Sequence, residues 1–120
     1  MAKRIHILED DGDIRFIVSY ILSETGYEVT EAETVKKFHE QLDISKPDLF
    51  LLDVMLPDGN GLDVCMELKK DQSISHIPVI IMSAHAARDL IRDQPCAVDF
   101  ISKPFDLDSL TLMIKRYIPD

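Results

Sequence analysis

The stretch "PDLFLLDVM", residues 47–55, decides the fold class of this chain. After Pro47 and Asp48 it is an almost unbroken apolar run, interrupted by a single acid, Asp53. A strand that is buried on both faces has such a continuous run, whereas a strand with one wet face alternates apolar and polar residues. The stretch "IPVIIMSA", residues 77–84, repeats the pattern. The two runs therefore predict the central strands of a parallel sheet covered by helices on both faces.

Shorter strands and amphipathic helices are predicted around these two runs. The further strands are residues 4–8, about 27–31, and 98–102. Apolar residues at helical spacing form four stripes between and after the strands: Ile14, Ile17, Val18, Ile21 and Leu22; Val35, Phe38 and Leu42; Leu62, Cys65 and Leu68; Leu107, Leu110, Met113, Ile114 and Tyr117. Residues 86–94 could add a short helix. Helix ends are indicated by Thr34, Asn60 and Asp106 as N-caps and Gly26 as a C-cap. Five strand–helix units predict an α/β fold with a parallel sheet.

Composition restricts the classes of function. The 120 residues suffice for one domain, and the net charge of −9 argues against direct nucleic-acid binding while suiting a cation or a basic partner. No apolar run is long enough to span a membrane and no secretory signal is apparent, which predicts a cytoplasmic protein. Cys65 and Cys96 lie far apart with no CxxC, so we expect buried thiols rather than a metal site or a disulfide.

The candidate functional residues are the polar side chains that directly follow the predicted strands. In an open parallel sheet, ligands bind beyond the carboxyl ends of the strands. The candidates there are Glu9, Asp10 and Asp11 after the first strand, Asp53 after the third, Ser83 after the fourth and Lys103 after the fifth. Carboxylates suit Mg²⁺, and a lysine or hydroxyl can hold phosphoryl oxygens. Together they predict phosphoryl transfer onto a carboxylate.

Each candidate also has a plainer interpretation. Asp10 and Asp11 alone would be acids at the N-terminus of a helix, where the dipole favours negative charge, and Asp13 fits the first turn of that helix. Ser83 alone would be an ordinary serine at a strand end, Lys103 alone a surface lysine, and Phe100 alone a core aromatic. The functional interpretation depends on the four strand ends occurring together in one chain.

Four motifs in order resemble the receiver domain of bacterial two-component response regulators, in particular single-domain chemotaxis regulators. They are the acidic pair in "LEDD", Asp53 in "LLDVMLPDGNG", Ser83-Ala84 after "VIIM", and "FISKPF". The resemblance covers residues 1–120 and implies one receiver domain without an effector domain. It also implies a flavodoxin-like three-layer α/β/α sandwich, with five parallel strands in the order 2-1-3-4-5 and five helices.

The resemblance implies a phosphoacceptor switch rather than an enzyme, with only self-phosphorylation and autodephosphorylation chemistry. Its phosphodonor would be a sensor histidine kinase or a phosphotransfer protein, and its target a protein bound through the fourth and fifth helices. The resemblance implies that Asp53 is the phosphoacceptor and that Asp10, Asp53 and the Met55 carbonyl are Mg²⁺ ligands, with Glu9 acting through a metal-bound water. It implies that Lys103 binds the phosphoryl group, that Ser83 and Phe100 are switch residues, and that the Lys103–Pro104 bond is cis. Met55 and His85 are the implied residues that set the phosphoryl lifetime.

Two departures and two competing functions qualify this interpretation. The segment from Ser83 to Lys103 is shorter than usual in the family, and Cys96-Ala97 stands where Gly-Ala is common, so we expect a short, irregular or shifted fourth helix. An Mg²⁺-dependent aspartyl phosphohydrolase would need DxD, and this chain has "DVM". A pseudo-receiver that only docks would not need the complete set of acids, serine and lysine.

Overall fold

The computed structural model describes residues 2–84 and 96–119. Its main sheet has the order β2-β1-β3-β6-β7 and is parallel throughout. The strands are β1 (Arg4–Leu8), β2 (Glu28–Ala32), β3 (Leu49–Asp53), β6 (Val79–Ala84) and β7 (Asp99–Lys103). The helices within the described residues are α1 (Gly12–Glu24), α2 (Val35–Ile44), α3 (Gly61–Lys70) and α5 (Leu107–Tyr117). The predicted strand order is confirmed, while the helix predicted at 86–94 lies outside the described residues.

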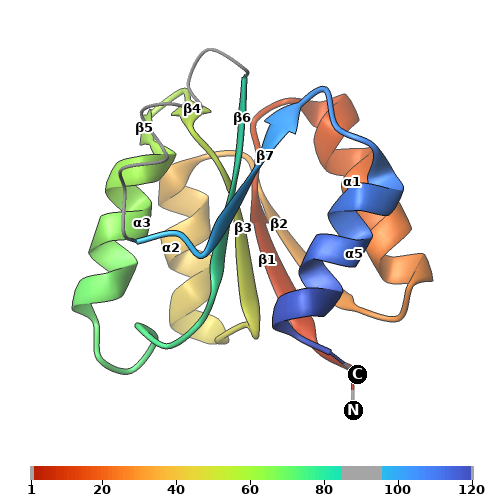
Figure 1. Cartoon of the computed structure of the whole chain (residues 1–120). Coiled ribbons are helices and arrows are strands. Elements are labelled where there is room, and N and C mark those ends of the chain that lie inside the picture. The colour runs from red at the N-terminus through yellow and green to blue at the C-terminus, as the bar shows by residue number, and fades with distance from the viewer. Residues whose placement is uncertain (1, 85–95, 120) are drawn as a thin grey trace.

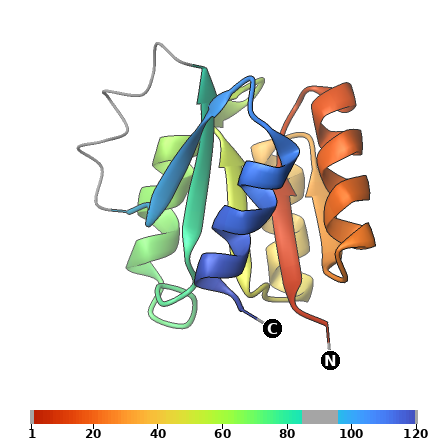
Figure 2. The ribbon, with the colours of Figure 1, turned by 45° about the vertical axis from the view of Figure 1, so that its right-hand side comes forward.

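Helices cover both faces of the sheet, as the apolar runs predicted. Figure 1 shows α2 and α3 on one side and α1 and α5 on the other, and Figure 2 shows the same layers after a turn. β3 lies at the centre between β1 and β6, and all five of its residues are buried. None of the helices in the described parts of the chain is long and apolar enough to cross a membrane.

The alternating sides of β3 divide the core into two clusters. Phe50 and Leu52 face α2 and α3, whereas Leu49 and Leu51 face α1 and α5. Burying such side chains stabilises the fold by about 1.5–3 kcal/mol each relative to leaving them exposed. One expectation was wrong: Ile17 was predicted in the buried stripe of α1, but it is 47% exposed.

Local chemistry determines where the helices begin and end. The side chains of Asp11, Thr34, Asn60 and Asp106 each accept backbone N–H groups at the start of a helix. These contacts satisfy donors that have no partner inside the helix. Gly26 follows α1 with a φ of 108°, a conformation that side chains with a Cβ rarely adopt. The three predicted N-caps are therefore confirmed, and Gly26 lies one residue beyond the C-cap Thr25. Asp11 is a fourth N-cap, where the plainer interpretation had predicted only an acid favoured by the helix dipole.

The segment after β3 differs from the prediction. The apolar run suggested a strand to residue 55, but β3 ends at Asp53 and the chain leaves the sheet. β4 (Met55–Leu56) then pairs antiparallel with β5 (Gly59–Asn60) in a small hairpin. The turn residues of "LPDGNG" reverse the chain there, so the apolar character of Val54 and Met55 did not indicate more strand.

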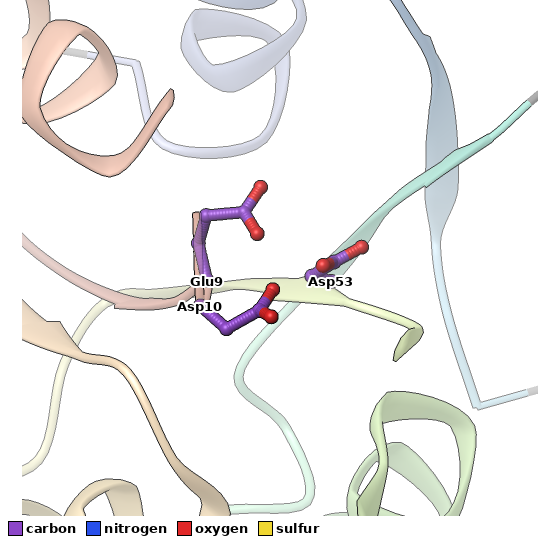
Figure 3. Close-up of side chains that lie close together, drawn as sticks. All are labelled: Glu9, Asp10 and Asp53. Carbon is purple, nitrogen blue, oxygen red and sulfur yellow. The ribbon is translucent and has the colours of Figure 1, made fainter. Parts of the chain in front are cut away.

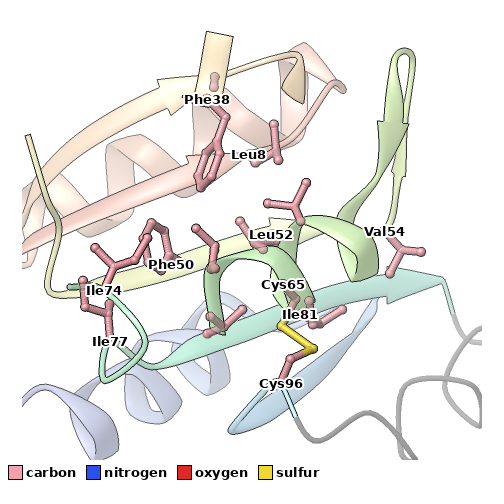
Figure 4. Close-up of a cluster of buried hydrophobic side chains, with 14 residues drawn as sticks. Leu8, Phe38, Phe50, Leu52, Val54, Cys65, Ile74, Ile77, Ile81 and Cys96 are labelled. Carbon is pink, nitrogen blue, oxygen red and sulfur yellow. A yellow bond between two sulfur atoms is a disulfide. The ribbon is translucent and has the colours of Figure 1, made fainter. Parts of the chain in front are cut away.

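The two cysteines also differ from the prediction. Cys65 of α3 and Cys96, just before β7, form a disulfide, with Cα atoms 5.7 Å apart. Figure 4 shows the bond among the buried side chains beneath α3. Both residues were expected to be separate buried thiols, and burial is the part of that expectation that holds. Residues 31 apart in sequence give no local signal that the fold will place them side by side.

Candidate functional site

Three carboxylates meet at the carboxyl edge of the central strands. Glu9 and Asp10 follow β1, Asp53 ends β3, and these two strands are neighbours in the sheet. Figure 3 shows the three side chains close together, and one ligand oxygen from each lies within 4.8 Å of the others. Glu9 is fully buried and Asp53 is 6% exposed, whereas Asp10 is open to solvent. The fold therefore gathers acids that are 44 or 43 residues apart in sequence.

Lys103 reaches this cluster from the end of β7. Its Nζ lies 2.5 Å from Glu9 Oε1 and 3.2 Å from Asp53 Oδ1. Burial opposes the charge on Lys103, but the hydrogen bond to Glu9 and the charge of Asp53 outweigh it and raise the pKa of the ammonium. Lys103 is therefore a fixed positive charge between two buried acids.

One lysine does not neutralise the cluster completely. Burial, together with the hydrogen bond and charge of Asp53, raises the pKa of Glu9 from 4.5 to about 7, although the hydrogen bond and charge of Lys103 act in the opposite direction. The raised pKa means that Glu9 binds a proton more tightly than an ordinary glutamate does, and a cation at the site would compete with that proton for the same oxygens.

Backbone groups orient the acids. The Val54 N–H donates to Asp53 Oδ1 at 2.9 Å, and the Asp11 N–H donates to Glu9 Oε2 at 3.3 Å. The guanidinium of Arg15, one turn into α1, donates to the Glu9 carbonyl at 2.9 Å. We did not identify Arg15 from the sequence, because a single arginine in a helix carries no signal that it folds back on the preceding loop.

Gly61, the first residue of α3, was also missed. A Cβ placed on Gly61 would lie 1.8 Å from the carbonyl oxygen of Asp53, so only glycine allows the helix to start so close to that acid. Its N–H donates to the Val54 carbonyl at 2.8 Å. The glycine was visible in "LPDGNG", but it indicated a turn rather than an approach to the site.

The remaining candidates lie around the cluster. Ser83 is fully buried near the end of β6, and its hydroxyl has no hydrogen-bond partner within residues 2–84 and 96–119. Phe100 pairs with Ile81 across β6 and β7 and is half-buried. The side chain of Met55 is 76% exposed beside the site, and His85 lies outside the described residues. The Lys103–Pro104 bond is cis, as the resemblance implied.

The donor set suits a hard divalent cation. Mg²⁺ prefers oxygen ligands, binds through one or two carboxylates and keeps several waters. Glu9, Asp10 and Asp53 supply such oxygens, with Asp10 on the solvent side. The buried hydroxyl of Ser83 is a polar group that a further oxygen ligand could satisfy. The residues present therefore fit Mg²⁺ together with an anionic group.

Comparison with known proteins decides the family. Residues 5–115 match the family described as the response regulator receiver domain. The chain belongs to this family. It is 38% identical over 117 residues to the phosphate regulon transcriptional regulatory protein PhoB of Escherichia coli, covering 96% of this chain and 51% of that protein. The chain thus spans about half the length of this relative.

Solved receiver domains have the same architecture. A signal receiver domain of a signal transduction histidine kinase from Syntrophus aciditrophicus superposes with a TM-score of 0.89 at 33% identity, covering 98% of this chain and 90% of that one. The receiver domain of a sensor histidine kinase from Pseudomonas aeruginosa, described with a magnesium ion coordinated in its active-site cleft, has a TM-score of 0.88 at 22% identity, with both chains covered completely. The chain is accordingly a receiver domain related to the response regulators of phosphorelay signalling.

Proposed function

We propose that this receiver domain accepts a phosphoryl group on Asp53 from a histidine kinase or phosphotransfer protein, with Mg²⁺ bound, and controls a protein partner by changing conformation. One observation carries the proposal. Asp53 lies in contact with Lys103 and within reach of the oxygens of Glu9 and Asp10, at the edge of the sheet where ligands bind. The magnesium ion described in the Pseudomonas receiver domain supports the choice of metal.

The chemistry assigns one step to each group. A carboxylate oxygen of Asp53 attacks the phosphorus of a phosphohistidine, a P–O bond forms, the P–N bond breaks, and the leaving imidazole takes up a proton. Lys103 already lies 3.2 Å from Asp53 Oδ1 and can hold a phosphoryl oxygen as it arrives. Asp10, Asp53 and the Met55 carbonyl would hold Mg²⁺, with Glu9 acting through a water, and the bound ion would neutralise the charge that develops at the phosphoryl group.

The response to phosphorylation would begin at Ser83. Its buried hydroxyl can donate to a new phosphoryl oxygen, and a contact made only in the phosphorylated state shifts an existing equilibrium. Phe100 lies on the neighbouring strand β7 and would move inward with that shift. The output surface would be the face of the fourth and fifth helices, of which α5 is described and the fourth lies outside the described residues, with a protein rather than nucleic acid as the partner.

Intact-mass measurement tests the proposal. The wild-type chain is incubated with acetyl phosphate, with Mg²⁺ or with EDTA, beside Asp53→Asn and the control Asp43→Asn. Asp43 is an exposed acid of α2, away from the cluster. We expect a single phosphoryl adduct in the wild type and in Asp43→Asn, only with Mg²⁺, and none in Asp53→Asn.

The other outcomes separate the competing functions. An adduct that persists in Asp53→Asn or in EDTA contradicts the assignment of Asp53. A wild-type chain that forms no adduct with any donor, yet still binds a partner, would be a pseudo-receiver. Continuous turnover of phosphomonoesters would indicate a phosphohydrolase.

A further inference from the structure

The β4–β5 hairpin begins two residues after Asp53, and its base lies against the backbone of Asp53 and Val54. Val54 is buried, and Gly61 closes the far side of the hairpin with its N–H on the Val54 carbonyl at 2.8 Å. The two strands contribute only two residue pairs, Met55 with Asn60 and Leu56 with Gly59. An isolated two-stranded hairpin is marginally stable in water at best. Its geometry therefore depends on contacts with the rest of the protein.

The tip of the hairpin is attached to α2. The carboxylate of Asp58 accepts the backbone N–H of Val35 at 2.8 Å on Oδ1 and that of Lys36 at 3.1 Å on Oδ2. These are first-turn donors of α2 with no partner inside the helix. The third, Lys37 N–H, donates to Thr34 Oγ1 at 3.1 Å. α2 thus has two caps, one from its own chain start and one from the hairpin.

A packing contact supports the same attachment. A Cβ on Gly59 would lie 3.0 Å from Cγ2 of Val35, so the hairpin rests closely on that side chain. Val35 in turn packs against the core cluster beneath α2 and α3. The hydrogen bond from the Val35 N–H and that from the Lys36 N–H lower the pKa of Asp58, which favours its charged carboxylate. Charge at the start of a helix is favoured by the helix dipole.

Met55 needs this external support. Its side chain is 76% exposed, so packing of that side chain does not hold the backbone in place, although Leu56 packs on the core. The proposed function uses the Met55 carbonyl as a metal ligand, and Mg²⁺ tolerates little error in ligand geometry. Only two residues, Leu56 and Pro57, lie between Met55 and the tether at Asp58.

We propose that Asp58 is a positioning residue for the metal site: by tying the hairpin tip to the first turn of α2, it holds the Met55 backbone where its carbonyl can bind Mg²⁺. This inference rests on the proposed function. Asp58 itself touches neither the metal nor the phosphoryl group, and it acts through the hairpin.

Calorimetric titration of Mg²⁺ into metal-free protein tests the inference without any phosphodonor. The variants are Asp58→Ala, Asp58→Asn and, as a matched control, Thr34→Ala. The control removes the other cap of α2 and leaves the hairpin tether intact. We expect Asp58→Ala to weaken Mg²⁺ binding three- to tenfold, Asp58→Asn to fall between it and wild type, and Thr34→Ala to stay within twofold. Both alanine variants should lower the melting temperature by a few degrees.

Amide NMR shifts give a second, structural measurement. In metal-free Asp58→Ala the amides of Val54 and Met55 should shift, whereas Thr34→Ala should affect α2 alone. Wild-type affinity in Asp58→Ala, or equal weakening in both alanine variants, would overturn the inference and leave the proposed function standing. A wild-type chain that binds no Mg²⁺ would overturn the metal assignment and this inference with it.

Discussion

Because Glu9 is buried, we expect the free energy of unfolding of the metal-free protein to fall as pH rises. The pKa of Glu9 rises from 4.5 in the unfolded chain to about 7 in the folded one, first because of burial and then because of Asp53. The folded state therefore holds the proton more tightly than the unfolded state. Below pH 4.5 Glu9 is protonated in both the folded and the unfolded state, so its ionisation does not lower the free energy of unfolding. Between pH 4.5 and 7 the unfolded chain ionises first, so stability falls as pH rises, and above pH 7 the loss is complete.

The size of this loss of unfolding free energy follows from the shift in the pKa of Glu9. Each unit of pKa difference corresponds to about 1.4 kcal/mol, so the free energy of unfolding should fall by about 2–3 kcal/mol between pH 5 and pH 8. Because the side chain of Glu9 is fully buried, solvent screens this effect little. Glu9→Gln keeps the shape of the protonated side chain and removes the titration.

Urea unfolding in EDTA at pH 5 and pH 8 measures the difference. Wild type should lose about 2–3 kcal/mol relative to Glu9→Gln over this interval. His6, whose pKa burial lowers to about 4, titrates in both proteins and cancels. Saturating Mg²⁺ should restore more stability at pH 8 than at pH 5, because metal and proton compete. A difference between the two proteins that is constant with pH would refute the argument.

Three further predictions concern other parts of the structure. Gly61→Ala should destabilise the fold by about 2–4 kcal/mol and slow phosphorylation, because its Cβ would lie 1.8 Å from the Asp53 carbonyl oxygen. Gly12→Ala, whose Cβ would meet nothing closer than 3.8 Å, is the control in thermal melts and should be neutral. Cys96→Ser should lower the unfolding free energy by about 3–4 kcal/mol, since the disulfide closes a loop of 31 residues; urea curves unchanged by this substitution or by reductant would contradict it. Met55→Asn should shorten the phosphoryl lifetime severalfold by admitting a hydrogen-bonded water, and equal decay of the mass adduct in variant and wild type would exclude that role.

The fold class and the location of the candidate site could be predicted from the order of residues alone. The runs before Asp53 and Ser83 are apolar on both sides of the strand, and only a parallel sheet covered by helices buries both faces. The carboxyl ends of the strands in such a sheet share one edge. Glu9 and Asp10, Asp53 and Lys103 all follow or end strands, so they could be assigned to that edge. The strand order came with the family resemblance.

Tertiary structure alone decided how these groups meet. Lys103 pairs with Glu9, 94 positions away, and with Asp53, 50 positions away. Asp58 binds the start of α2, 22–23 positions away, and Cys96 forms its disulfide with Cys65, 31 positions away. Such contacts depend on strand order and on the exact path of each loop, and neither leaves a periodic pattern in the residues concerned. Local periodicity records which face of an element is buried, whereas contacts between distant elements exist only once the whole core has packed.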